Sequence, residues 1–146
     1  MRPLLRALAA LPLLAAAAAA QPAKFHAASP TAPLSQVVEV GNTIYLSGML
    51  GTAAGGQLAP GGIAAETRQT LENVKAALAR VNATMADVVK CTVFLVDVAE
   101  WDAMNAVYVT YFPTNKPARS AIGVAGLVRN ARVEIECLAV RGAGGG

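Results

Sequence analysis

Hydrophobic and polar residues follow two different periods along this chain, and the longer period predicts two helices. Between residues 63 and 81 the positions expected to be buried recur every three or four residues, which is the spacing of one helix face. These positions are Ile63, Thr67, Leu71, Val74, Leu78 and Val81. A second helix is expected before Pro113, with Trp101, Met104, Val107, Tyr108 and Tyr111 on its buried face.

Short runs of β-branched residues, which are typical of strands, lie before, between and after these helices. Two of them, at residues 37–40 and 44–46, flank the pair Gly41-Asn42. This pair suits a two-residue hairpin turn, because both residues tolerate positive φ. Further strands are expected at residues 88–96, 119–127 and 131–141. The order of the elements predicts an α+β sandwich in which two helices pack against one sheet.

The first 20 residues differ from the rest of the chain. They read MRPLLRALAALPLLAAAAAA, with Arg2 and Arg6 ahead of an apolar stretch that ends in small residues, which is the pattern of a secretory signal peptide. The stretch is shorter than the about 20 apolar residues of a membrane-spanning helix. We therefore expect a periplasmic or secreted protein without stable membrane association after cleavage. The alternatives are a short uncleaved anchor or, if the start is assigned too early, a cytoplasmic protein.

The rest of the chain fits one folded domain. Residues 21–32 read as an irregular lead-in, residues 33–141 as the domain, and residues 142–146 as a flexible glycine-rich tail. Of the 146 residues, 55% are hydrophobic and 14% are charged. The formal charge of +3 falls to +1 without the two leader arginines. The remaining lysines and arginines form no basic stripe, so no nucleic-acid partner is expected.

Few residue types that carry chemistry are present, which excludes several classes of enzyme. His26 is the only histidine, and it falls in the lead-in, where we expect an exposed residue without a role. One histidine and two distant cysteines lack the spacing of a metal site, and Leu46-Ser47-Gly48 lacks the pattern of a serine hydrolase. The glycine-rich stretch 51–62 lacks the Gly-Lys-Ser/Thr sequence of a nucleotide-binding loop. No metal and no cofactor are therefore expected.

The two cysteines, Cys91 and Cys137, each fall in an expected strand. Because side chains alternate along a strand, Cys91 is expected on the face of Val89 and Val93, and Cys137 on the face of Ile135. Both would then point into the apolar layer. Two interpretations remain: a pair of inert core thiols, or a disulfide if the strands are neighbours and the compartment is oxidising.

The charged residues near the C-terminus are the remaining candidates for chemistry. In the run RVEIEC, alternation places Glu134 and Glu136 on the face opposite Val133 and Ile135. Arg119 lies near the start of the preceding strand, and a guanidinium can bind a carboxylate through two parallel hydrogen bonds. A glutamate near it could orient a water or move a proton. The alternative is a polar sheet face that carries a salt bridge.

Six short motifs occur in a specific order along the chain. They are Ser47-Gly48, TRQTLEN at residues 67–73, DVVK at 87–90, NAVY at 105–108, PARS at 117–120 and VEIE at 133–136. Together they resemble the RidA/YjgF family of reactive-intermediate (enamine/imine) deaminases, over roughly residues 33–141. The resemblance implies a chorismate-mutase-like sandwich (bacillus type), with one mixed sheet and two helices on one face, assembled as a homotrimer with sites between subunits.

The resemblance also implies an activity and a set of site residues. The activity is hydrolysis of short 2-imino acids, or their 2-amino-enoic tautomers, to 2-oxo acids and ammonia. Arg119 matches the carboxylate-binding arginine, and Glu134 matches the glutamate that positions the attacking water. Asn105, Ser47 and Gly48 match positions that line the cleft. The alternative function is a trimeric, non-catalytic module that binds small carboxylates through Arg119.

The chain departs from the family pattern at several positions. Leu34 stands where many members have a tyrosine, Met49 replaces a frequent glutamine, and Ala121 replaces a frequent cysteine. Val128 replaces a common proline, and the stretch 113–117 is short. Because loops shape a pocket, these changes are expected to affect the choice of substrate more than the fold.

Overall fold

The computed structural model describes residues 20–145, so almost all of the expected signal peptide, residues 1–20, lies outside the described residues. The strands are β1 (Lys24–Ala27), β2 (Ser35–Val40), β3 (Thr43–Leu46), β4 (Met49–Leu50), β5 (Val88–Leu95), β6 (Ala118–Gly123) and β7 (Val133–Val140). The helices are α1 (Ile63–Ala79) and α2 (Trp101–Tyr108), with the 3-10 turns η1 (Met85–Asp87), η2 (Val98–Glu100), η3 (Val109–Tyr111) and η4 (Val128–Asn130).

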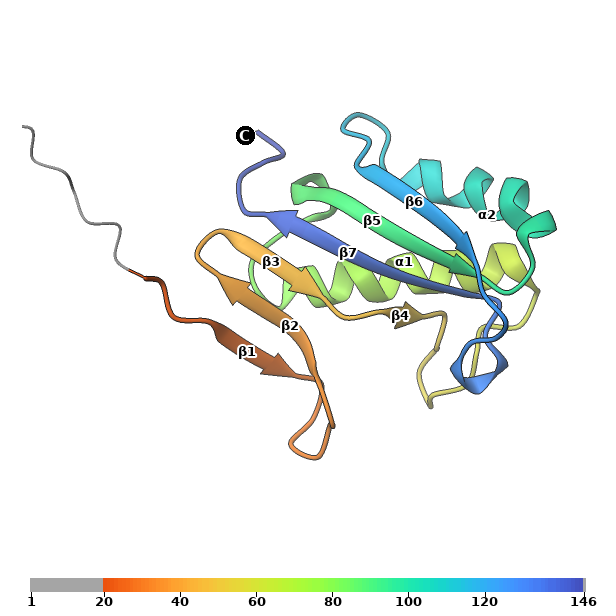
Figure 1. Ribbon diagram of the computed structural model, residues 1–146, viewed down its shortest axis with the longest axis horizontal. Helices are drawn as coiled ribbons and strands as arrows, with labels where there is room; N and C mark the ends of the chain where they lie inside the picture. Colours follow the sequence, from red (N-terminus) through yellow and green to blue (C-terminus); the bar gives the residue numbers. More distant parts are fainter. Residues whose placement is uncertain (1–19, 146) are drawn as a thin grey trace, which may run out of the picture.

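The strands form one mixed sheet in the order β1-β2-β3-β7-β5-β6, and the short β4 also pairs with β7 (Figure 1). The pair β5–β6 is parallel, and the other pairs are antiparallel. A parallel pair needs a crossover connection, which α2 supplies between β5 and β6. The turn between β2 and β3 is the expected two-residue hairpin, since Val40 pairs with Thr43 and Gly41 has a φ of 60°.

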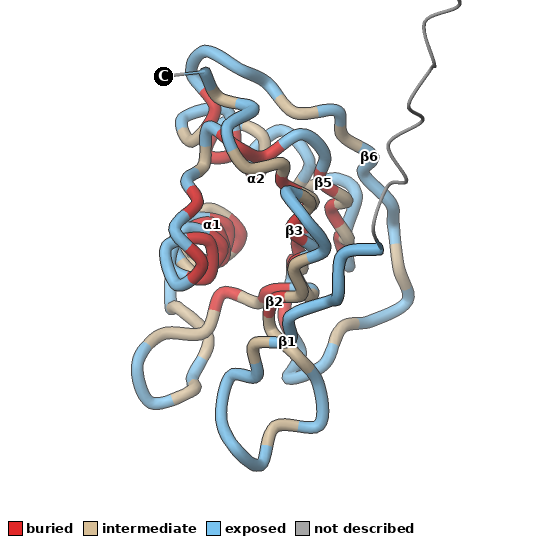
Figure 2. The backbone as a smooth tube through the Cα atoms, turned by 90° about the vertical axis from the view of Figure 1, so that its left-hand side faces the viewer, coloured by how far each residue is buried: buried red, intermediate tan, exposed pale blue. Residues whose placement is uncertain are grey.

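Both helices lie on one side of the sheet (Figure 2). The buried side chains of the helices and strands form one hydrophobic core between the two layers. The expected face of α1 is confirmed, because Leu71, Val74 and Leu78 are fully buried against the sheet. Asn82 follows the helix with a φ of 55°, a left-handed conformation that asparagine tolerates. The predicted α+β sandwich with two helices on one face is therefore confirmed.

The second helix differs from its prediction at both ends. Met104, Val107 and Tyr108 are buried as expected, but Trp101 is exposed and Tyr111 is only half-buried. The α-helix ends at Tyr108 and continues as the 3-10 turn η3 to Tyr111. The expectation that Trp101 belongs to the core is wrong, because this residue lies at the edge of the sandwich, beside β6.

The expected irregular lead-in contains a strand. Lys24–Ala27 pairs antiparallel with β2 as the edge strand β1. His26, expected to be exposed and without a role, is half-buried, and its Nε2 lies 2.7 Å from Glu39 Oε1 on β2. Glu39 also forms an ion pair with Arg141. The expectations of an irregular segment and of an exposed His26 are both wrong. The proline and serine content of the segment predicts irregular structure, but backbone hydrogen bonds to β2 and the polar contact of His26 with Glu39 order it.

The glycine-rich tail, as far as it is described, packs on the body of the domain. The backbone N–H of Gly142 donates a hydrogen bond of 2.8 Å to Asp87 Oδ1. A Cβ on Gly144 would lie only 2.6 Å from Ala86 Cβ. Gly142 and Gly144 therefore contact η1, and Gly146 lies outside the described residues.

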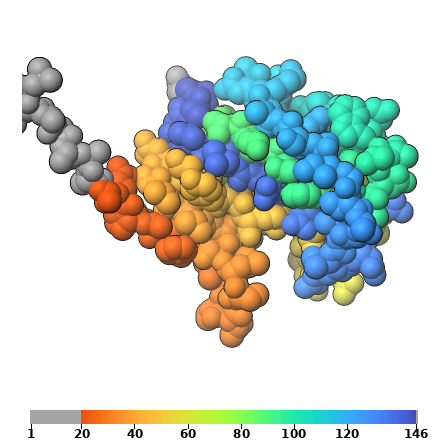
Figure 3. Space-filling view, viewed as in Figure 1, coloured from red at the N-terminus to blue at the C-terminus, as the bar shows by residue number. Residues whose placement is uncertain are grey.

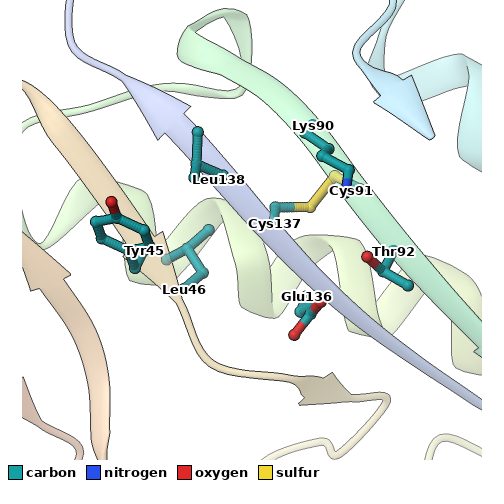
Figure 4. Close-up of a pocket in the computed structure, with 8 residues that line it drawn as sticks. All are labelled: Tyr45, Leu46, Lys90, Cys91, Thr92, Glu136, Cys137 and Leu138. Atoms are coloured by element: carbon teal, nitrogen blue, oxygen red, sulfur yellow. A yellow bond between two sulfur atoms is a disulfide. The ribbon is translucent and has the colours of Figure 1, made fainter. Parts of the chain in front are cut away.

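Cys91 and Cys137 form a disulfide that joins β5 to β7 (Figure 4). The two residues are direct partners in the antiparallel ladder, with Cα atoms 4.1 Å apart, and both are buried. The interpretation as unpaired core thiols is therefore wrong, and the disulfide alternative is confirmed. Cys91 shares its face with Val93 but not with Val89, which is exposed because the register shifts between Val88 and Lys90.

The second face of the sheet carries no helix and faces the viewer in Figures 1 and 3. Apolar side chains are exposed there, including Tyr45 and Ile122. A cavity of about 180 Å³ on this face lies over β3, β7 and β5, where Tyr45, Lys90 and Leu138 contribute to its lining (Figure 4). Within residues 20–145 no helix has the length and apolar content needed to cross a membrane.

Candidate active site

Arg119 lies on β6, the strand at the edge of the sheet, and points toward the helices. It pairs in register with Cys91 on β5, and Cys91 pairs with Cys137 on β7. Side chains of registered partners stand on the same face of a sheet. Because the two cysteines are buried on the helix-covered face, Arg119 projects from that face as well, at the open margin beside α2.

Three residues of α2 hold the Arg119 guanidinium. Its Nη1 donates a hydrogen bond of 2.8 Å to Asn105 Oδ1. Its Cζ lies 4.5 Å from the ring centroid of Tyr108 and 5.4 Å from that of Trp101. Such cation–π contacts fix the direction of the guanidinium while leaving most of its N–H donors free. We call Arg119, Asn105, Trp101 and Tyr108 the arginine half-site.

The arginine half-site borders a cavity of about 270 Å³. The wall is mostly aromatic and apolar, with Phe112 and Pro117 beside the two rings, and Lys116 adds a second cation. Burial raises the pKa of Tyr108 to about 12, against the opposing charge of Arg119, so the phenol stays neutral. Arg119 makes no ion pair with any carboxylate in residues 20–145. The cavity is therefore positively charged and suits a small carboxylate.

Glu134 lies on β7 and belongs to a second group of predicted residues. Its neighbours Val133 and Ile135 are fully buried, so Glu134 stands on the helix-free face of the sheet, as alternation predicted. Its carboxylate packs against Gly48, where a Cβ would lie 1.9 Å from Glu134 Oε1. Ser47 precedes Gly48 and is half-buried. We call Glu134, Gly48 and Ser47 the glutamate half-site.

The environment of Glu134 disfavours its charged form. Burial raises the pKa of its carboxyl above the usual value, and the negative charge of Glu136, which stands on the same face two residues later, adds to this effect. A carboxylate with a raised pKa is a better proton acceptor than an ordinary one. Glu134 can therefore act as a base toward a bound water.

Within one chain the two half-sites are on opposite faces of the sheet. Glu134 pairs with Phe94, which in turn pairs with Ile122 on β6, and this row stands on the helix-free face. Arg119 belongs to the row of the disulfide, on the helix-covered face. The structure thus brings Arg119 together with Asn105, and Glu134 together with Gly48, but it does not bring the two pairs together in one subunit.

Trp101 and Tyr108 are the residues that the sequence interpretation missed. The helical pattern assigns both to the core, where only Tyr108 is buried, and does not show that both rings also form the surface on which Arg119 lies. A signal for this was present, because Trp101, Asn105 and Tyr108 follow one another at steps of four and three, the spacing of one helix face. A candidate polar residue on that face implies that its two aromatic neighbours face the same cavity.

Two positions that depart from the family pattern lie beside the half-sites. Ala121 lies two residues after Arg119 on β6, and therefore on the same face of the sheet. Met49 follows Gly48 and is buried, with its Sδ 3.8 Å from Gln36 Nε2. Leu34 is exposed just before β2.

Among residues 20–145 no group of three His, Cys, Asp or Glu side chains is placed to bind a metal ion. The two half-sites offer the guanidinium of Arg119, which can bind an anion, the carboxyl of Glu134 with its raised pKa, and the amide of Asn105. This set can position a small anionic molecule and a water beside each other if both half-sites face one cleft.

Comparison with known proteins gives one consistent result. Residues 25–141 match the protein family described as endoribonuclease L-PSP. The 2-iminobutanoate/2-iminopropanoate deaminase of Capra hircus is 47% identical over 111 residues, which is 75% of this chain and 81% of that protein. The human deaminase of the same name is 42% identical over 111 residues, again 75% of this chain and 81% of that protein.

Solved structures agree with the sequence matches. The Escherichia coli YjgF gene product has a TM-score of 0.71 at 38% identity, covering 75% of this chain and 88% of that one. Escherichia coli TdcF, solved with bound serine, has a TM-score of 0.71 at 33% identity, with the same coverage of 75% and 88%. On the family match and these identities, the chain belongs to the RidA/YjgF family, whose profile carries the endoribonuclease L-PSP description.

Proposed function

We propose that this protein hydrolyses short 2-imino acids, or their 2-amino-enoic tautomers, to 2-oxo acids and ammonia. Its mammalian relatives at 42–47% identity are named 2-iminobutanoate/2-iminopropanoate deaminases. The observation that carries the proposal is the Arg119 guanidinium, held by Asn105 and two aromatic rings at a cavity that contains no acidic lining residue.

The reaction needs positioning more than reactive groups. An imine carbon is already electrophilic, and protonation of its nitrogen makes it more so. Arg119 binds the substrate carboxylate, and Glu134 holds a water within about 3 Å of the imine carbon. The water oxygen bonds to that carbon as the C=N π pair moves to nitrogen. Glu134 takes a proton from the water and returns it to nitrogen, which gives a carbinolamine. The hydroxyl of this intermediate then gives its proton to nitrogen through Glu134 as the C=O bond forms and the C–N bond breaks, so that ammonia and a 2-oxo acid are released.

The proposed site contains residues of two subunits of a homotrimer. One chain holds Arg119 and Glu134 on opposite faces, so Arg119 of one copy must meet Glu134 of another for both to contact one substrate. The helix-free face exposes apolar residues such as Tyr45 and Ile122, which association would cover. Both features support an assembly in which the helix-free face of one subunit meets the β6 edge of the next.

Mixing two inactive variants tests the shared site. Arg119→Ala and Glu134→Gln trimers are each expected to be inactive, and subunit exchange in an equal mixture should restore activity at about a quarter of the sites. Production of 2-oxo acid from 2-iminopropanoate, formed in place by an amino-acid oxidase, measures the recovery. If both residues acted in one subunit, the mixture would stay inactive, and the proposed arrangement would be wrong.

A carboxylate-binding module without turnover is the second candidate, and the isolated arginine half-site favours it. Arg119 and Asn105 alone can bind a carboxylate, whereas hydrolysis also needs the partner's glutamate half-site. Titration with pyruvate in parallel with the ammonia assay separates the two functions. Binding of pyruvate without ammonia release from 2-iminopropanoate would establish the module and reject the deaminase.

We further propose that the protein acts outside the cytoplasm. The leader pattern of residues 1–20 supports export, and the disulfide between Cys91 and Cys137 supports an oxidising compartment, where such bonds persist. Its substrate would then be an imino acid formed outside the cytoplasm, for example by oxidation of an amino acid. Fractionation of cells that express the full chain tests this proposal, since a cytoplasmic, uncleaved product would contradict it.

Gly48→Ala is expected to lower kcat/KM roughly 10- to 100-fold with little change in thermal stability. Gly48 has no positive φ, so its backbone accepts alanine, but the new Cβ would displace the Glu134 carboxylate. Gly126→Ala is the matched control, because Gly126 also has no positive φ and no atom within 4 Å of an added Cβ. Equal activity of the two variants would remove Gly48 from the site.

The dependence of kcat/KM on pH should report the raised pKa of Glu134. Glu134 must be ionised to accept a proton, so activity should fall, as pH decreases, at a higher pH than an ordinary carboxyl with a pKa of 4.5 would give. Glu136→Gln removes the repelling charge and should move this acid limb to lower pH, although burial keeps it above the ordinary value. If the acid limb of Glu136→Gln stays in place or moves to higher pH, the assignment of this limb to Glu134 is contradicted. Glu72→Gln on α1 is the control and should leave the limb in place.

A further inference from the structure

A second cavity, of about 420 Å³, lies apart from the arginine half-site. It opens between the C-terminal half of α1, the strands β2 and β4, and the loop before α1, and its volume falls in the range of about 300–1,000 Å³ typical of small-molecule sites. Two arginines, Arg80 at the end of α1 and Arg129 on η4, line it. No aspartate or glutamate is among its lining residues, so the cavity is strongly positive.

The two guanidiniums are held in place, but only by neutral groups. Arg80 Nη2 donates a hydrogen bond of 2.9 Å to the carbonyl of Ala27, and its Nη1 donates to Gln36 Oε1. Arg129 Nη1 donates a hydrogen bond of 2.7 Å to the carbonyl of Gly56. Each guanidinium has five N–H donors, so most of them remain available. Fixed donors bind a ligand with less loss of side-chain entropy than mobile ones.

The lack of an acidic partner distinguishes Arg80 and Arg129 from Arg132 and Arg141. Arg132 pairs with Glu100, and Arg141 pairs with Glu39. Arg80 and Arg129 form no ion pair within residues 20–145. Two uncompensated positive charges at one cavity attract an anion of matching charge.

The two side-chain amides of the cavity, of Asn73 and Gln36, are already used by the protein. Asn73 Nδ2 donates hydrogen bonds to the carbonyls of Leu50 and Thr52, at 2.8 and 2.9 Å, and its Oδ1 accepts from Gln69 at 3.0 Å. The amide of Gln36 contacts Arg80 and Met49. A neutral polar ligand such as a sugar would therefore find few free partners, whereas an anion finds two guanidiniums.

We propose that this cavity binds a small oxyanion with two or more negative charges, of the phosphate or polycarboxylate class, between Arg80 and Arg129. The guanidiniums recognise the ligand, and no nucleotide-type glycine loop is involved. Neither Arg119 nor Asn105 lines this cavity, so the site is distinct from the arginine half-site. It does share Gly48 with the glutamate half-site, but Glu134 is not among its lining residues.

Calorimetric titration tests the site, with inorganic phosphate and citrate as separate probes at constant ionic strength. The unmodified protein is expected to bind at least one of the two probes. Comparison of the phosphate titration with the citrate titration shows whether the cavity recognises phosphate or a polycarboxylate. Arg80→Gln and Arg129→Gln should each weaken binding about tenfold, and the double variant should abolish it. Arg68→Gln is the matched control, because Arg68 lies on the same helix, forms no ion pair in the described chain and does not line the cavity.

Arg119→Ala separates this site from the proposed active site, since it should keep full affinity for phosphate or citrate. Loss of binding in Arg119→Ala would place the anion in the arginine half-site and overturn the proposal. Undiminished binding by the two single variants, or no binding of either probe at about 10 mM by the unmodified protein, would also overturn it. The single variants keep the test valid if the double variant does not fold.

Discussion

Replacement of Arg119 by alanine should lower kcat/KM for 2-iminopropanoate roughly 10²- to 10⁴-fold. The guanidinium is proposed to hold the substrate carboxylate through two charged hydrogen bonds, each worth about 1.5–3 kcal/mol, and about 1.4 kcal/mol corresponds to a factor of ten in rate. The fold should survive, because Arg119 is only half-buried and pairs with no carboxylate in residues 20–145. The measurement is ammonia release at substrate concentrations far below KM.

Two further variants make this result specific. Arg119→Lys keeps the charge but loses the planar pair of donors, so it should recover only a small part of the activity. Arg68→Ala removes an arginine that lies on α1, outside both half-sites, and should leave kcat/KM unchanged. If Arg119→Ala turned over 2-iminopropanoate at the normal rate, Arg119 would not be the carboxylate-binding residue, and the mechanism would have to be abandoned.

The helices and most strands could be predicted because their signals are local. The repeat from Ile63 to Leu78 and the Gly41-Asn42 turn each specify an element without reference to the rest of the chain. The alternation in Val133–Glu136 correctly separates the buried residues of β7 from its two glutamates. The burial of such residues can be predicted from the periodicity of the sequence around them.

Other features depend on partners that are distant in sequence. Lys24–Ala27 becomes a strand only because β2 offers it a free edge, and His26 is fixed only by Glu39. The disulfide requires β5 and β7 to be neighbours in register, which composition cannot reveal. The separation of Arg119 from Glu134 is of the same kind, because the register of β6 on β5 decides on which face the arginine stands.

The register also explains why Arg119 and Glu134 lie on consecutive strands and yet on opposite faces of the sheet. β6 and β7 both pair with β5, so Arg119 and Glu134 lie on the two strands that flank β5. Arg119 and Glu134 are each held on a regular strand, which positions side chains more accurately than a loop does. The position of one half-site relative to the other then depends on how subunits associate, and this makes the assembly a part of the proposed catalytic apparatus.

Removal of the disulfide should cause the largest loss of stability. The bond between Cys91 and Cys137 closes a loop with a sequence separation of 46 residues. Restricting an unfolded chain over such a loop stabilises the folded state by about 4 kcal/mol in the chain-entropy description. The variant Cys91→Ala/Cys137→Ala should therefore unfold at a temperature about 10–20 °C lower. The two proteins should be compared at one concentration, because the association proposed above would also contribute to stability.

The same variant should retain most of its activity below its unfolding temperature. Ladder hydrogen bonds pair β7, β5 and β6 around these positions, so Arg119 and Glu134 keep their places without the sulfur bridge. Reductant should act slowly on the native protein, because the two cysteines are 1% and 5% exposed, and quickly once denaturant is added. Alkylation of unreduced, denatured protein followed by mass spectrometry should find no free thiol. Two alkylated cysteines, or equal stability of the variant and the unmodified protein, would show that β5 and β7 are held together by packing and hydrogen bonds alone.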